Sequence, residues 1–305
     1  MLHFFLTPLD GARLLRPYFR IQYIMVLSDI VIILCRVTEP GNVGAVCRAM
    51  KNMGLSRLRI TGTARESLDG EVIRARAVHA ADIWDRAAFF DTLPAAAADC
   101  SLLVGTTRRR GRHRKQVSLD PRRLAAWIEE KPGSAALVFG NERTGLEDSE
   151  LDLCNIASHI PVSGVFPSLN LSHAVQIYAY ELFLALGNGA GPLPGAETGG
   201  AATEGGNPAG GAENGRGRPD AVKGTWVPLT YAEAAGLAES ITDTLRSLGF
   251  YRHPGREIQE QFLRDLICRA GLTGREGEYL GNMFAKAWRL ARGKPGTPPD
   301  RTGSP

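Results

Sequence analysis

The chain lacks the features that mark membrane, secreted and zinc-bound proteins. It has no apolar run near the roughly 18–20 residues that span a bilayer. Its five cysteines are odd in number and scattered, and they form no CxxC pair. This pattern indicates reduced thiols rather than a disulfide framework or a zinc site. We therefore expect a cytoplasmic protein with no membrane contact and no metal.

The chain also lacks a strong charge of one sign. It has 36 Lys and Arg against 32 Asp and Glu, a formal net charge of +4. A polyanionic partner must therefore be inferred from clusters of charge rather than from the total. With 305 residues, 44% of them hydrophobic, the chain can bury a sizeable core in one large domain or two.

A third shortage, of aromatic residues, divides the chain. No aromatic residue occurs between Phe183 and Trp226, and residues 187–224 hold thirteen of the 35 glycines. Such a segment cannot offset its ordering entropy by burial, so it predicts a flexible linker that leaves the part beyond it without a fixed place. The predicted organisation is a poorly ordered extension at 1–27, with Met25 as the natural start, an α/β domain at 28–186, a linker at 187–226, a helical domain at 227–292 and a disordered tail at 293–305.

Buried strands alternate with helices in the first domain. Strands are predicted at 30–36, 57–61, 87–90, 101–105 and 135–139, and helices at 42–53, near 71–79, within 92–98 and at 120–130. This alternation indicates a largely parallel sheet with helices on both faces. Beyond the linker, Thr230 is placed to cap a helix that reaches Leu248, and further helices are predicted at 256–270 and 274–291.

Two loops after buried segments carry the polar and glycine-rich residues of the first domain. Gly140-Asn141-Glu142-Arg143-Thr144-Gly145-Leu146 follows the strand at 135–139, and Phe166-Pro167-Ser168-Leu169-Asn170-Leu171-Ser172 opens a helix that runs to Phe183. Loops at the carboxyl ends of parallel strands form the ligand crevice of such sheets. Ordinary strand–helix connections are the alternative.

The helix at 42–53 has an apolar stripe and an opposite polar face. Arg48 lies on the polar face with Gly44. A solvated arginine is the simple interpretation. However, Asn42 and Gly44 at the helix start would let the backbone approach a phosphate or ribose, and Arg48 would reach the same group one turn later.

A basic run follows the strand at 101–105. Residues 108–115 contain six cations, namely Arg108, Arg109, Arg110, Arg112, Arg114 and Lys115. Clustered cations repel one another unless a polyanion joins them, so nucleic acid phosphates are the predicted partner. The alternative is a solubilising loop.

Three motifs in order resemble those of the SPOUT superfamily of RNA methyltransferases, and within it the TrmJ-type tRNA ribose 2′-O-methyltransferases. They are Asn42-x-Gly44-x-x-x-Arg48, Phe139-Gly140-x-Glu142-x-x-Gly145-Leu146 and Ser168-Leu169-Asn170-Leu171. The resemblance covers residues 28–186 and extends to the C-terminal helices, at 248–250, 269–273 and 275–276.

The resemblance implies a C-terminal trefoil knot, S-adenosylmethionine as cofactor, tRNA as substrate and a homodimer with sites at the subunit interface. By position, the implied cofactor contacts are Thr106, Thr107, Arg108, Gly140, Ile160, Pro167, Ser168 and Leu169. The implied reaction is methyl transfer to a ribose 2′-OH, at position 32 of the anticodon loop.

The implied catalytic set is Arg48, Asn42, Glu142 and Asn170. A guanidinium is a poor base, so we expect Arg48 to orient a phosphate and stabilise the nascent alkoxide. Glu142 is either a base or, more simply, a carboxylate that holds its loop together, and Asn170 is either a helix cap or a substrate contact. His79, His159 and His173 show no metal spacing.

Two other functions stay open at this point. One is a ribosomal RNA 2′-O-methyltransferase of the same superfamily. The other is a catalytically silent RNA-binding module, which would use the basic run, with Arg109, Arg110, Arg112, Arg114 and Lys115, and the C-terminal helices as an RNA clamp.

Overall fold

A seven-stranded parallel sheet forms the centre of the molecule. The computed structural model describes residues 25–108, 118–164, 168–187, 226–251 and 255–292. The strand order is β3-β2-β1-β6-β4-β7-β5, and each neighbouring pair runs parallel. The predicted fold class is therefore confirmed. The strands are β1 (Ile30–Cys35), β2 (Arg57–Thr61), β3 (Ala88–Phe90), β4 (Leu102–Thr106), β5 (Ser118–Leu119), β6 (Ala135–Phe139) and β7 (Ile156–Ser158).

The central strands are buried on both faces, which explains their continuous apolar sequences. In β1, Ile30, Ile32 and Leu34 enter one core, whereas Val31, Ile33 and Cys35 enter the other. β6 alternates in the same way. A sheet that is covered on both sides needs no polar alternation along its strands.

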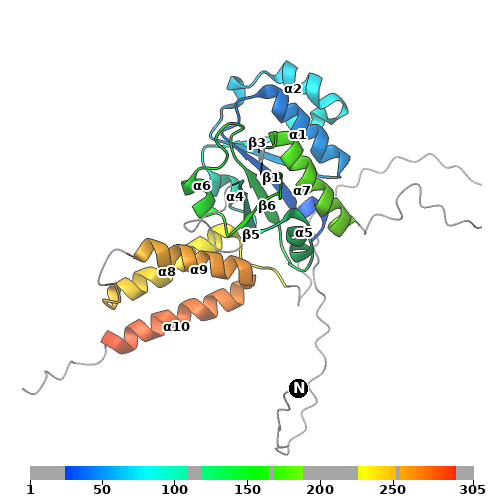
Figure 1. Ribbon diagram of the computed structural model, residues 1–305. Helices are drawn as coiled ribbons and strands as arrows, with labels where there is room; N and C mark the ends of the chain where they lie inside the picture. The colour runs from blue at the N-terminus through cyan, green and yellow to red at the C-terminus, as the bar shows by residue number, and fades with distance from the viewer. Residues whose placement is uncertain (1–24, 109–117, 165–167, 188–225, 252–254, 293–305) are drawn as a thin grey trace, which may run out of the picture.

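The first face is covered by helices from the first domain (Figure 1). They are α1 (Pro40–Asn52), α2 (Gly70–Ala77), α3 (Ala81–Asp85), α5 (Pro121–Glu129) and α7 (Leu171–Leu186), with short 3₁₀ turns at Leu27–Asp29, Arg65–Ser67 and Val78–Ala80. α7 packs against both α1 and α5. From the described residues of this domain, the second face receives only the short helices α4 (Leu93–Ala97) and α6 (Asp148–Leu153).

Gly44 has a different role from the one expected. It is buried, and a Cβ at this position would lie 2.4 Å from the carbonyl oxygen of Ile73 and 2.7 Å from the Cβ of Arg76. The backbone of α1 therefore approaches α2, not a phosphate or ribose. The glycine serves helix packing, because no side chain fits between the two helices.

The C-terminal helices complete the second face of the sheet. They are α8 (Tyr231–Ser247), α9 (Arg256–Ala270) and α10 (Gly274–Arg292), and Thr230 caps α8 as predicted. Tyr231 and Ala234 of α8 and Ile267 of α9 share one apolar core with Val31 and Ile33 of β1.

Polar contacts also fix this placement. The Tyr231 N–H donates to the Cys100 carbonyl (2.6 Å), and Asn155 Nδ2 donates to the buried carboxylate of Asp265 (3.3 Å). The expectation that the helical part has no fixed place thus differs from the structure. The reason is that α4 and α6 are too short to cover the second face alone.

The described residues also refine the ends of the chain. Met25 is 1% exposed and packs in the first core, so the extension predicted at 1–27 cannot include Met25. Residues 1–24, 188–225 and 293–305 lie outside the described residues. All five cysteines are buried, and none forms a disulfide. Among the described helices, none has the length and hydropathy needed to cross a membrane.

The docking of α8 on the sheet predicts the effect of one substitution. Ala234→Arg should lower the free energy of unfolding by more than about 3 kcal/mol, because Ala234 is fully buried and a charge cannot be solvated there. Ala285→Arg, at an exposed position of α10, is the matched control and should change it by less than about 0.5 kcal/mol. Urea unfolding gives both values, and equal midpoints would show that α8 does not pack on the sheet in solution.

Candidate active site

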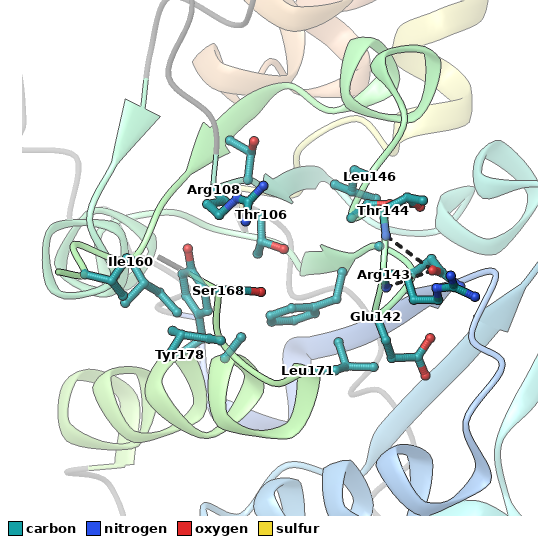
Figure 2. Close-up of a pocket in the computed structure, with 18 residues that line it drawn as sticks. Thr106, Arg108, Glu142, Arg143, Thr144, Leu146, Ile160, Ser168, Leu171 and Tyr178 are labelled. Carbon is teal, nitrogen blue, oxygen red and sulfur yellow. Dashed lines mark hydrogen bonds between the residues drawn. The ribbon is translucent and has the colours of Figure 1, made fainter. Parts of the chain in front are cut away.

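A cavity opens at the carboxyl edge of the sheet, beside the ends of β4, β6 and β7 (Figure 2). Its wall comes from chain segments that are far apart in sequence. They meet here because their strands are parallel neighbours and end at the same edge. The lining residues are Thr106, Thr107, Arg108, Phe139, Gly140, Asn141, Glu142, Arg143, Thr144, Gly145, Leu146, Ile160, Val162, Ser168, Leu169, Leu171, Ala174 and Tyr178.

The cavity gathers most of the residues expected to contact a cofactor. Thr106, Thr107, Arg108, Gly140, Ile160, Ser168 and Leu169 line it. Pro167 lies outside the described residues. The lining joins apolar side chains to many backbone polar groups, which suits a ligand with a flat apolar part and polar ends.

One wall is the cavity loop, which we define as residues 140–146. The Gly145 N–H donates to the Asn141 carbonyl (2.8 Å), and Asn141 Oδ1 accepts from the N–H groups of Arg143 (2.9 Å) and Thr144 (3.4 Å). A Cβ on Gly140 would lie 2.0 Å from the carbonyl carbon of Gly145. Only glycine fits there, because the loop folds back directly onto its own start.

The inner end of the cavity is aromatic and neutral. The Phe139 and Tyr178 rings meet edge to face at 5.6 Å. The Tyr178 hydroxyl donates to Ser158 Oγ (2.9 Å), which donates to the Leu119 carbonyl (2.7 Å). Burial raises the pKa of Tyr178, so its hydroxyl stays protonated. Our sequence reading missed Tyr178, although it falls on the buried stripe of α7 with Leu171, Val175 and Leu182.

Glu142 lines the cavity, but its carboxylate is engaged with the segment after β1. Its oxygens accept from the N–H groups of Thr38 (3.3 Å) and Glu39 (3.2 Å) and from the Thr38 hydroxyl (3.4 Å). In Figure 2 the side chain extends from the loop toward this blue N-terminal segment. The geometry favours a carboxylate that holds two loops together over a general base.

Asn170 and Asn42 lie next to the cavity wall and contact each other. Asn170 Oδ1 accepts from the Ser172 N–H (2.9 Å) at the start of α7, and its Nδ2 donates to Asn42 Oδ1 (2.9 Å). Asn170 is therefore a helix cap that also connects α7 to α1. A substrate contact would have to use its remaining hydrogen-bonding capacity.

Arg48 is not brought to the cavity within one chain. It is exposed on α1 and is absent from the cavity lining. The basic residues Arg109, Arg110, Arg112, Arg114 and Lys115 lie outside the described residues. Among the histidines, His79 and His173 are exposed, and His159 Nδ1 shares a hydrogen bond with Ser118 Oγ (2.9 Å).

Sequence comparison assigns this cavity to a family. The sequence model described as the SpoU rRNA Methylase family matches residues 29–180, which contain the sheet, the first ten residues of α7 and the whole cavity lining. A protein of Cronobacter sakazakii is 40% identical over 276 residues, covering 88% of this chain and all of that protein. The chain belongs to the SpoU methylase family.

The relatives carry names of one kind. The Cronobacter protein is named a tRNA (cytidine/uridine-2′-O-)-methyltransferase, TrmJ. A protein of Methanocaldococcus jannaschii, named a tRNA (cytidine-2′-O-)-methyltransferase, TrmJ, is 38% identical over 154 residues. That match covers 50% of this chain and 66% of the archaeal protein, just under two thirds of its length.

A solved structure extends the similarity beyond the first domain. The crystal structure of TrmJ from Z. mobilis superposes with a TM-score of 0.61 at 25% identity, over 84% of this chain and 98% of that one. Coverage of this extent includes more than the SpoU methylase part alone. The SpoU methylase family therefore accounts for the cavity, and the similarity to TrmJ proteins reaches into the helical part.

Two substitutions at one position separate the two roles of Glu142. Glu142→Gln keeps one of the two acceptor oxygens, so the contact with either Thr38 or Glu39 survives, and we expect methyl transfer to fall by less than about tenfold. Glu142→Ala removes every contact and should lower it further. Loss of a general base would instead cost about 10²–10⁴-fold in both variants. Turnover at saturating cofactor distinguishes these results, and an equal large loss in both would assign the proton transfer to Glu142.

Proposed function

We propose that this protein transfers a methyl group from S-adenosylmethionine to a ribose 2′-OH of tRNA, at position 32 of the anticodon loop. The observation that carries the proposal is the cavity at the sheet edge, built from the motif loops and matched by the SpoU family. The tRNA substrate is supported by full-length similarity to the Cronobacter protein, including the C-terminal helices.

The cavity is chemically suited to S-adenosylmethionine. Leu146, Ile160 and Leu169 offer apolar surface for an adenine ring, and the backbone of the cavity loop offers polar groups at the same wall. The Tyr178 hydroxyl is already bonded to Ser158, so this end of the cavity presents an aromatic face rather than a free polar group. When bound, the cofactor would supply a sulfonium methyl group that is open to attack by an oxygen nucleophile.

The protein's own residues would then position the ribose. The 2′-hydroxyl would be the nucleophile toward that methyl group, and its proton would pass to solvent. We assign to Arg48 the contact with the adjacent phosphate and with the developing negative charge on the oxygen. Asn42 and Asn170 would fix the approach of the substrate where α1 and α7 meet. Glu142 would hold the wall rather than take the proton.

The same proposal includes a homodimer, a trefoil knot and action in the cytoplasm. Arg48 lies outside the cavity of its own chain, which supports a site completed at a subunit interface. The chain after β6 returns through α6 and β7 to α7, whose first residues share the cavity with the loop that follows β6. That arrangement supports the knot. Five buried cysteines, none of them in a disulfide, support a reducing compartment.

Ribosomal RNA is the alternative substrate. The one observation that supports rRNA is the description of the matching family model, which names rRNA methylation. The test is transfer of a labelled methyl group to purified tRNA and to purified rRNA, followed by mapping of ribose methylation. Methylation of rRNA alone would replace tRNA in the proposal. No transfer to either RNA, with binding retained, would favour the catalytically silent module.

Arg48→Ala should lower turnover by far more than tenfold while cofactor affinity changes only a few-fold, because Arg48 is placed on the substrate side of α1. Lys51→Ala is the control on the same helix, since Lys51 is bonded to Asp82 (2.5 Å) and has no assigned role in the reaction. Single-turnover assays and calorimetric titration give the two quantities. If the variant keeps more than a tenth of the unmodified protein's turnover, the activation barrier has risen by less than about 1.4 kcal/mol, and Arg48 does not have the assigned role.

Neutralising Arg109, Arg110, Arg112 and Arg114 together should weaken tRNA binding and reduce its salt dependence. Each lost phosphate contact should lower the slope of log affinity against log salt by about 0.7–0.9. Replacing Arg74 and Arg86 is the control, because both are exposed and paired with Asp85 and Asp82. Filter binding across a salt series measures the slope, and an unchanged slope means that the basic run contacts no phosphate.

A further inference from the structure

We propose that Arg36 is a positioning residue that holds the cavity loop in its binding shape and ties it to helix α1. Nothing in the three motifs points to Arg36. The part that concerns the cofactor rests on the proposed function. The part that concerns the loop is carried by the contacts of Arg36 itself.

The backbone of Arg36 adopts a conformation that must be held by its surroundings. Arg36 directly follows β1 and has a φ of 55°, which only one other described non-glycine residue, Val78, resembles. For a residue with a Cβ, the left-handed region is sterically unfavourable. Its N–H donates to the Thr61 carbonyl (2.8 Å). This bond keeps the turn against β2 and directs the side chain toward the cavity loop.

The side chain of Arg36 contacts the far end of the cavity loop and the start of α6, which follows directly. Its Nε and one terminal nitrogen donate to the two carboxylate oxygens of Glu150, both at 2.8 Å. The same terminal nitrogen donates to the Gly145 carbonyl (3.1 Å), and the other nitrogen lies 3.1 Å from Glu147. Hydrogen bonding to Glu150 raises the pKa of Arg36, so the charge is permanent.

The backbone carbonyl of Arg36 holds the near end of the same loop. It accepts a hydrogen bond of 2.6 Å from Asn141 Nδ2. Asn141 in turn orders the loop through its own contacts with Arg143, Thr144 and Gly145. One residue therefore contacts the loop where it begins and where it ends, and residues 140–146 between these contacts all line the cavity.

The same segment leads into the helix that carries the proposed catalytic residues. Thr38 and Glu39 follow Arg36 and donate to Glu142 in the middle of the loop, and α1 begins at Pro40. The Glu150 side chain is 14% exposed and that of Arg36 is 28% exposed, so this bidentate pair is better shielded than a surface pair. The contacts together fix the distance between the cavity wall and the start of α1.

A purely stabilising ion pair is the competing explanation, and the chain contains a matched control. Arg59 forms a similar fork with Asp99, with contacts of 2.5 and 2.8 Å, and its side chain is 13% exposed. Within the described part of the chain Arg59 contacts no cavity residue: its other partners are the Ala96 carbonyl, Cys100 and the Phe90 ring, and none of them lines the cavity. Loss of either pair should lower stability, but only loss of the Arg36 pair should change the loop.

The first test uses the full-length protein without ligand. Arg36→Gly removes the side chain while glycine still accepts the left-handed backbone, and Glu150→Gln weakens the same fork from the other side. Hydrogen exchange at the amides of Arg143, Thr144 and Gly145 should become at least tenfold faster in both variants, and stay unchanged in Arg59→Ala. Unchanged exchange in Arg36→Gly, or an equal increase in Arg59→Ala, would overturn the proposal.

The second test measures the effect on the cofactor. Titration with S-adenosylmethionine should give a Kd about tenfold higher for Arg36→Gly and for Glu150→Gln, with kcat at saturating cofactor within a few-fold. The double variant should bind S-adenosylmethionine no more weakly than the single variant with the higher Kd, because the two residues act through one fork. If the losses of cofactor affinity in the two single variants add up in the double variant, Arg36 and Glu150 do not act through one fork. An equal loss of affinity in Arg59→Ala would show that the effect is not specific to Arg36. If the unmodified protein binds no S-adenosylmethionine, the proposed function fails, and the exchange measurement still decides the role of Arg36.

Discussion

The parallel pairing of β1 with β6 is the constraint on which the site depends. Five consecutive residue pairs, from Ile30 with Ala135 to Leu34 with Phe139, bring both strands to the same edge in register. The residues that follow, Arg36 after β1 and Gly140 after β6, therefore leave the sheet side by side. Every contact between the segment after β1 and the cavity loop is a consequence of this register. A slip by one residue would exchange the side chains that enter the two cores and would move Arg36 by one residue relative to the start of the cavity loop.

Much of the fold could be predicted because its strands are short, apolar and separated by amphipathic helices. The strand at 135–139 and the helices from 256 and from 274 agree with the structure to within about a residue at most ends. The helix α6, with the sequence Asp-Ser-Glu-Leu-Asp-Leu, was missed because six residues with only two apolar side chains give no clear apolar period. The two-residue strand β5 was missed for a similar reason, since it is too short for a pattern.

The site was only partly predictable, because the type of a residue does not determine which groups its side chain contacts in the folded protein. The cavity loop and Ser168-Leu169 were found from their glycine and proline chemistry and from the family motifs. Arg36 gave no signal, since an arginine after a strand is usually solvated, and its left-handed backbone is visible only in three dimensions. Glycine at position 44 was given a ligand role, whereas it allows α1 to pack on α2. The composition of the linker likewise could not show that α8 and α9 pack on the second face of the sheet, which the short helices of the first domain leave partly open.

The pairing of β1 with β6 also has a consequence for synthesis of the chain. β1 lies in the middle of the sheet, yet β2 is its only neighbour until residues 135–139 have left the ribosome. During that time the other edge of Ile30–Cys35, an uncharged and fully apolar strand, has no partner. Such an edge can pair with other chains. Folding of this protein therefore depends on late-synthesised segments, and the last of them, α8 and α9, close the second face only after the long glycine-rich stretch has emerged.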